Sequence, residues 1–223
     1  WELLVIDNNS HDDTARIVKD FAASACFPVR YAFEGRQGLS YARNCGMALA
    51  QGDIIAFTDD DVRVNDRWLA ALHREFTVDP AVAVVCGRTL PIQSDVFPLG
   101  TKVSPDWKQY RHPSAPLEIG LGNNMAIRRE ITQRIGEFDV QLGAGTRSGA
   151  GEDTDYIYRV LKSGYIALYA PAAIVMHDHD RVTPAAVRRI QCNYRRGYGA
   201  FLAKHCLRGD SWTFRLGWWD QHA

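Results

Sequence analysis

The fold is decided by the stretch Gly52-Asp53-Ile54-Ile55-Ala56-Phe57-Thr58-Asp59-Asp60-Asp61. Its apolar run at 54–57 is short and bounded by polar residues, which predicts a buried strand. Apolar residues recur at helical spacing on both sides of it, at 39–50 and from 66 to 76. Strands that alternate with helices of this length indicate an α/β fold with a mostly parallel, twisted sheet flanked by helices.

The rest of the chain continues this alternation. Helical spacing is found at 12–25 and again from Glu152 onward, whereas residues 91–118 are rich in proline and polar residues and are expected to form a loop. Apolar runs predict further strands at 3–6, 29–33, 81–86, 119–128, 165–169 and 173–176. Ligands bind beyond the carboxyl ends of parallel strands, and two polar clusters, at 7–9 and 59–61, follow strands directly.

Composition excludes several classes of protein. The 223 residues carry 26 Lys and Arg against 26 Asp and Glu, so bulk charge gives no reason to expect a nucleic-acid partner. No apolar run approaches the roughly 20 residues that span a bilayer. The five cysteines lack metal-binding spacing and are odd in number, which favours a reducing compartment and hence a cytoplasmic location.

The C-terminal region, residues 181–223, is expected to be a basic helical extension. It contains arginines and tryptophans that suit the anionic cytoplasmic face of a membrane. Packing of the same residues against the core is an equal alternative. The residues concerned are Arg188, Arg189, Arg195, Arg196, Trp212, Trp218 and Trp219.

The three carboxylates at 59–61 predict a divalent-cation site. Alternation along an extended segment directs Asp59 and Asp61 to the same side, and hard oxygen ligands suit Mg²⁺ or Mn²⁺. His177, which follows the strand at 173–176, is able to complete an oxygen-rich metal shell. The alternatives are a solvated acidic turn or helix cap for the triplet, and a surface role for the histidine.

Three other groups have both a chemical and a structural interpretation. Glu152 and Asp153 open a helix behind a glycine-rich stretch, so they are either a general base with its neighbour or a capping pair. The cluster at 7–9 offers donors and acceptors for a nucleobase edge, or simply caps the next helix. Arg36, Arg43 and Arg88 are candidates for diphosphate contact, or are solvated cations.

Taken in order, these motifs resemble the family 2 glycosyltransferases, whose catalytic domain has the nucleotide-binding glycosyltransferase A fold. The resemblance covers about residues 1–180, which would be the catalytic domain, with the family's first strand missing from this chain. It rests on the segments 5–14, 38–46, 52–61, 122–128, 135–139, 151–155, 164–165 and 171–177.

The resemblance also implies roles for individual residues. Asp61 would be the more direct metal ligand of the Asp-x-Asp pair, with Asp59 nearer the ribose and His177 joining the Mn²⁺ or Mg²⁺ shell. Asp153 would be the catalytic base, with Glu152 beside it. The residues expected to bind the nucleotide sugar are Asp7, Asn8, Arg43, Asp59, Asp60, Asn123 and Asn124.

The function expected from this resemblance is inverting, metal-dependent transfer of a sugar from a nucleotide-diphosphate donor to a hydroxyl of a saccharide, lipid-linked or other acceptor, in polysaccharide or glycoconjugate biosynthesis. Two alternatives stay open. A nucleotidyltransferase would also bind a nucleotide and a metal, although the glycine- and lysine-rich phosphate loop of that class is absent. A non-catalytic sugar-nucleotide-binding module of a larger synthase would need no base, although Asp59, Asp61 and Asp153 are all present.

Overall fold

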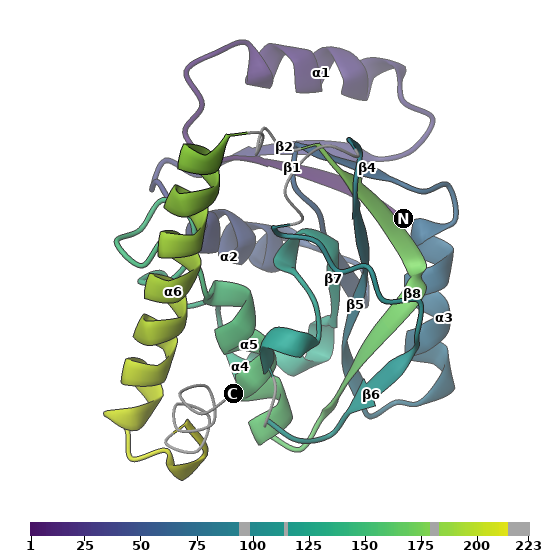
Figure 1. The fold of residues 1–223 in the computed structure, drawn as a ribbon. Helices are drawn as coiled ribbons and strands as arrows, with labels where there is room; N and C mark the ends of the chain where they lie inside the picture. Colours follow the sequence, from purple (N-terminus) through teal and green to yellow (C-terminus); the bar gives the residue numbers. More distant parts are fainter. Residues whose placement is uncertain (94–98, 114–115, 179–182, 214–223) are drawn as a thin grey trace.

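In the computed structural model, which describes residues 1–93, 99–113, 116–178 and 183–213, one mixed sheet forms the centre of the molecule (Figure 1). Its strands lie in the order β3-β7-β5-β8-β4, and β6 also pairs with β8. The bounds are β3 Ile54–Phe57, β4 Val62–Val64, β5 Val82–Pro91, β6 Lys108–Tyr110, β7 Met125–Arg128 and β8 Ile166–His177.

The expectation of a mostly parallel sheet is wrong. Within the central sheet only β5 and β8 pair in parallel, whereas β7 runs antiparallel to both β3 and β5, and β4 and β6 run antiparallel to β8. A parallel pair needs a crossover, usually a helix. The chain reaches β7 through the long segment after β5 instead of through a helical crossover, so it enters the sheet in the opposite direction.

Helices cover both faces of this sheet. On one face α3 (Trp68–Val78) buries Trp68, Leu72 and Phe76 against β5 and β8. On the other face α4 (Thr132–Ile135) and α5 (Glu152–Lys162) build a second apolar cluster with the sheet. The remaining helix on this side is α6 (Pro184–Cys206), which lies outermost and packs against α5 (Figure 1).

The first elements of the chain form a separate layer. Strands β1 (Leu3–Asp7) and β2 (Val29–Phe33) pair in parallel, with α1 (Thr14–Ser24) and α2 (Leu39–Leu49) beside them. No residue of α1 is buried, whereas Ser40 and Arg43 of α2 are. It is therefore α2 that joins this layer to the rest of the molecule.

Several predicted strands differ from the structure. The prediction for 119–128 is correct only for β7, because residues Gly122–Asn124 form a 3-10 turn, η2. The two strands predicted at 165–169 and 173–176 are one long strand, β8, with a register shift between them. The segment 91–118 contains β6 and a 3-10 turn, η1 (Pro116–Glu118), and a third such turn, η3 (Arg129–Ile131), precedes α4.

The basic helix expected near the C-terminus is α6. Thr183 caps it, since its side chain accepts a hydrogen bond of 3.2 Å from the amide of Ala186, and Pro184 occupies the first turn. Trp218 and Trp219 lie outside the described residues. In the part of the chain that the structure describes, no helix is both long and apolar enough to cross a bilayer.

Candidate active site

Several polar motifs of the sequence lie close together around the ends of β3 and β8 and the start of α5. They are the acidic turn at 59–61, His177, the pair Glu152 and Asp153, Asn123 and Arg43. The pairing of β4 with β8 places Val62 opposite His177, and the amide of Asp178 donates to the carbonyl of Asp61 at 2.8 Å. This register brings Asp61 next to His177, although 116 residues separate them. The sheet itself therefore joins the acidic turn to the end of β8.

Asp61 and His177 form the part of the site with metal-ligand chemistry. Asp61 Oδ2 lies 3.1 Å from His177 Nε2. His177 Nδ1 lies 3.4 Å from the Gly100 carbonyl oxygen and 3.4 Å from Asn123 Nδ2. A histidine that binds a metal through one ring nitrogen commonly donates the other N–H to a backbone carbonyl, and the Gly100 carbonyl is placed for this. The donor set of carboxylate oxygen and imidazole nitrogen fits Mn²⁺.

Asp59 lies beside this pair and Asp60 is exposed. The Asp59 side chain is 33% exposed, and burial raises its pKa, with Arg43 opposing the shift and Asp61 adding to it. The described residues hold no preformed cluster of three or more His, Cys, Asp or Glu ligands.

Arg43 connects Asp59 with the start of α5. Its Nη1 lies 2.6 Å from Glu152 Oε1, and its Nη2 lies 4.0 Å from Asp59 Oδ1. Burial lowers the pKa of Arg43, but the neighbouring carboxylates outweigh it and raise the pKa. Burial and the adjacent Asp153 raise the pKa of Glu152 against the effect of Arg43. One guanidinium therefore holds both acidic motifs in one site.

Gly122 makes room for this arrangement. A Cβ at Gly122 would lie 2.4 Å from Arg43 Nη2, closer than side chains tolerate. The Gly122 amide also donates to Asp153 Oδ2 at 2.9 Å, while Asp153 Oδ1 accepts from the Thr154 amide at 2.7 Å. Asp153 is half-buried, and two backbone donors hold its carboxylate in place.

Asn123 and Asn124 are adjacent but differ in environment. Asn123 contacts His177, and its Oδ1 lies 3.3 Å from the buried Thr89 hydroxyl, which donates to it. Asn124 is fully buried: it accepts from Trp68 Nε1 at 2.8 Å and donates to the carbonyls of Arg88 and Ala173. Asn124 thus fixes η2 to the core, whereas Asn123 belongs to the site.

Asp7 and Asn8 lie at the end of β1. Asp7 accepts from the Tyr31 hydroxyl at 2.7 Å and from the Ser10 amide at 2.8 Å, and the Tyr31 bond contributes most to lowering its pKa. Asn8 donates to the carbonyls of Glu34 and Arg36 and accepts from the Gly38 amide at 2.7 Å. The Asn8 side chain therefore shapes the loop before α2.

The other two arginine candidates differ in their surroundings. Arg36 forms a bidentate pair with Glu34, whose pKa the guanidinium lowers to about 2. Among the described residues, none accepts a hydrogen bond from the buried Nε of Arg88. Of these two, only Arg88 keeps an unused donor in its buried part.

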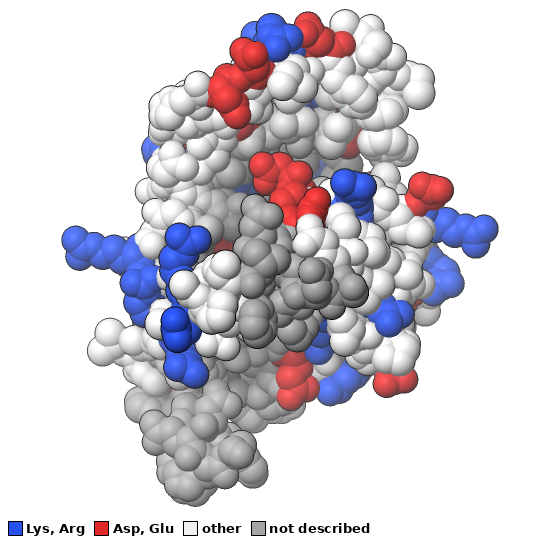
Figure 2. Space-filling model, turned by 45° about the horizontal axis from the view of Figure 1, so that its top comes forward, with Lys and Arg blue, Asp and Glu red and all other residues white. Residues whose placement is uncertain are grey.

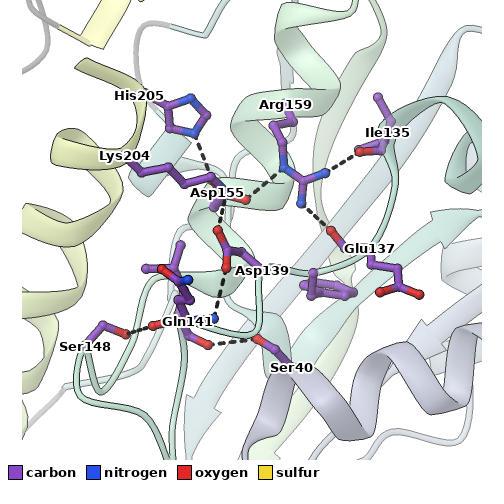
Figure 3. Close-up of polar contacts among 12 residues, drawn as sticks. Ser40, Ile135, Glu137, Asp139, Gln141, Ser148, Asp155, Arg159, Lys204 and His205 are labelled. Atoms are coloured by element: carbon purple, nitrogen blue, oxygen red, sulfur yellow. Dashed lines mark hydrogen bonds and ion pairs between the residues drawn. The ribbon is translucent and has the colours of Figure 1, made fainter. Parts of the chain in front are cut away.

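A buried ionic cluster, which sequence analysis does not predict, supports the start of α5 (Figure 3). Asp155 is fully buried and accepts from Arg159 at 2.8 Å and from Lys204 and His205 of α6 at 2.7 and 2.8 Å. Lys204 also pairs with Asp139 at 2.7 Å. The spacing of Asp155 and Arg159 is typical of a helix surface pair, and only the packing of α6 shows that it is buried.

Comparison with known proteins gives a consistent family. Residues 1–136 match the family described as Glycosyl transferase family 2. Succinoglycan biosynthesis protein ExoM of Rhizobium meliloti is 26% identical over 96% of this chain and 69% of its own length. The pre-mycofactocin glycosyltransferase of Mycobacterium tuberculosis is 30% identical over 72% of this chain, which spans 34% of that protein.

Solved structures agree on the fold. A mannosyltransferase from Pyrobaculum calidifontis, in complex with GDP-Man and Mn²⁺, has a TM-score of 0.64 at 20% identity and covers 92% of this chain and 55% of its own. GalNAc-T7 with UDP, GalNAc and Mn²⁺ has a TM-score of 0.62 at 20% identity over 80% of this chain and 38% of its own. The α/β architecture is thus that of glycosyltransferase A proteins, with a mixed sheet. Glu152, Asp153 and His177 lie beyond the matched family segment.

Proposed function

The chain belongs to glycosyl transferase family 2, and we propose that its active site consists of Asp59, Asp61, Glu152, Asp153 and His177. Members of this family transfer sugars from nucleotide-sugar donors with inversion. The observation that supports this most is the position of Arg43, which contacts both Glu152 and Asp59. Because this one side chain reaches both motifs, the acidic turn and the start of α5 act on the same substrate.

Asp153 is the proposed general base. Its carboxylate accepts the proton of the acceptor hydroxyl while the hydroxyl oxygen attacks the anomeric carbon. The bond from that carbon to the diphosphate oxygen breaks on the opposite side, so the nucleoside diphosphate leaves and the configuration inverts. The Gly122 and Thr154 amides hold the Asp153 carboxylate in one orientation throughout.

Asp61 and His177 are the proposed protein ligands for Mn²⁺ or Mg²⁺, with Asp59 next to them. When bound, the metal supplies positive charge for the diphosphate of the donor. The Gly100 carbonyl is placed to accept from His177 Nδ1, Asn123 lies beside the same ring atom, and Thr89 in turn holds Asn123. Arg43 keeps Asp59 in place. In this proposal Arg43 positions the carboxylates of Glu152 and Asp59 and does not bind the diphosphate.

The donor nucleoside is proposed to lie over the end of β1, near the buried Asp7 carboxylate and the loop that Asn8 fixes. Asn123 faces the sugar or the acceptor, and Asn124 positions Asn123 through its bond to Trp68. The acceptor is a hydroxyl compound, of saccharide or lipid-linked type.

A panel of UDP-, GDP- and dTDP-sugars, with and without Mn²⁺, tests this function. A cognate donor should raise the melting temperature in the presence of Mn²⁺, because a ligand that binds only the folded state stabilises it. Turnover should release a nucleoside diphosphate. Release of pyrophosphate, or stabilisation by every sugar nucleotide equally without metal, would overturn the proposal.

A further inference from the structure

The exposed face of α6 has an unusual charge composition. The 23 residues Pro184–Cys206 contain no Asp or Glu, and four of their arginines are exposed. In the described part of the chain none of these four forms an ion pair with a carboxylate, and Arg196 donates a hydrogen bond to the amide oxygen of Asn193. They are Arg188, Arg189, Arg195 and Arg196.

The four arginines lie on one side of α6. At 3.6 residues per turn they project from an arc of about 120°. The opposite side of the helix packs on the protein through Val187, Gly197, Phe201 and His205. The residues between the arginines on the exposed arc have small side chains, namely Ala185, Cys192, Gly199 and Ala203. Figure 2 shows Lys and Arg side chains on the left, the side on which α6 lies in Figure 1, and others on the right.

This shape suits a plane better than a narrow ligand. The 23-residue helix is about 34 Å long at 1.5 Å per residue, and small side chains lie between its arginines on the exposed side. From this geometry we infer that the exposed face of α6 docks the protein on an anionic membrane surface, with Arg188, Arg189, Arg195 and Arg196 contacting lipid phosphates.

Docking through α6 would also bring a loop of the active site close to the membrane. Arg196 and Arg147 line a hollow of about 520 Å³ together with Thr146 and Ser148. Residues 146–148 belong to the glycine-rich loop that leads into Glu152 and Asp153. Docking through α6 therefore places this loop next to the lipid headgroups, where a lipid-linked acceptor is presented; this last step rests on the proposed function.

Vesicle sedimentation tests the docking without any donor or acceptor, so its outcome does not depend on the transfer reaction. The intact protein should bind vesicles of phosphatidylcholine with 30% phosphatidylglycerol and not vesicles of phosphatidylcholine alone. Higher salt should release it, because salt screens exposed charges. Each arginine near the surface contributes about fivefold to the affinity, so replacing all four with glutamine should reduce it by roughly several hundredfold.

A matched control removes four exposed arginines outside α6, by R16Q, R67Q, R74Q and R129Q, and should bind almost as well as the wild type. Fluorescence gives a second readout that is independent of folding defects. An environment-sensitive dye on Cys192, with Cys26, Cys45 and Cys206 replaced by serine, should shift to the blue on anionic vesicles. A dye on Cys26 alone should not.

Three outcomes would overturn the docking proposal. They are equal binding to neutral and anionic vesicles, full binding by the Arg188→Gln, Arg189→Gln, Arg195→Gln and Arg196→Gln variant, and an unshifted Cys192 dye. Tight binding to heparin without binding to vesicles would assign this face to a polyanionic glycan instead.

Discussion

Arg43 of α2 and Glu152 of α5, 109 residues apart in the sequence, form an ion pair of 2.6 Å in which the side chains are only 5% and 7% exposed. Arg43 also lies 4.0 Å from Asp59. The same guanidinium thus joins the layer of β1 and β2 to both acidic motifs of the site. A buried charge without its partner is costly, which makes this pair testable through stability.

Arg43→Met should lower the free energy of unfolding by about 3–5 kcal/mol, because Glu152 is then left buried and unpaired. The double variant Arg43→Met with Glu152→Gln should recover most of that loss, since neither side chain of the pair then carries a charge. Urea unfolding of the wild type, Arg43→Met, Glu152→Gln and the double variant measures the coupling between the two residues. A double variant no more stable than Arg43→Met would contradict this account.

Gly122→Ala should strongly reduce turnover while the protein stays folded. The added Cβ would lie 2.4 Å from the Arg43 guanidinium, which must move and take Glu152 and the Gly122–Asp153 contact with it. Gly199 of α6 has no neighbour within 4 Å of an added Cβ, so Gly199→Ala is the matched control. The control should keep its activity and gain up to about 1 kcal/mol, as helix interiors favour alanine. Equal turnover by both variants would count against the role of Arg43.

Asp153→Asn should reduce turnover by about 10²–10⁴-fold while donor binding is retained, because the proton acceptor is lost. The asparagine oxygen can keep one of the two backbone hydrogen bonds that position Asp153. Isothermal titration with the cognate sugar nucleotide and Mn²⁺ measures binding, and release of nucleoside diphosphate measures turnover. Asp53, whose side chain is 99% exposed, provides the control Asp53→Asn. Wild-type turnover by Asp153→Asn would remove Asp153 from the mechanism.

Asp61→Ala and His177→Gln should each raise the Mn²⁺ concentration needed for half-maximal activity. Asp61 is the stronger candidate ligand because it is a carboxylate, so its loss should have the larger effect. Asn123→Ala removes the side chain that lies 3.4 Å from His177 Nδ1, and loss of a neighbour of a metal-binding histidine typically weakens metal affinity by about 10–100-fold. A manganese titration of donor turnover compares the three variants. An unchanged titration curve for Asp61→Ala would exclude it as a ligand.

The Asp155 cluster should make stability depend on pH in acid. Burial raises the pKa of Asp155, but the bonds from His205, Arg159 and Lys204 outweigh it and hold the pKa well below its usual range. A carboxyl whose folded pKa is lowered stabilises the fold above its unfolded pKa of about 4, and this contribution is lost as pH falls toward the folded value. The melting temperatures of wild type and Asp155→Asn should therefore differ most near neutral pH and converge below about pH 4.

The matched control for the cluster is Asp20→Asn, on the exposed surface of α1, where the change should stay within about 0.5 kcal/mol at every pH. A constant difference between the wild type and Asp155→Asn from pH 7 to pH 2 would mean that Asp155 acts through packing instead of through charge.

Local features of the site could be read from the sequence. The strands at 29–33 and 54–57, and the helix that opens at Glu152, are found at the predicted residues. Each of these depends on apolar spacing and boundary residues within about a dozen positions. The ordered motifs likewise led to the family, since they record residue identity and order, which need no coordinates.

The partners of these elements and side chains, in contrast, depend on the tertiary structure. Strand direction in the sheet depends on how the chain travels between strands, so β7 runs antiparallel although its local pattern resembles that of a parallel strand. The partner of a charge depends on which distant residue is buried beside it. Arg43 therefore pairs with Glu152, and the β4–β8 register places His177 against Asp61. Asp155 contacts Lys204 and His205 only because α6 packs on α5. Periodicity carries no information about contacts across a hundred residues, and those contacts determine the geometry of the site.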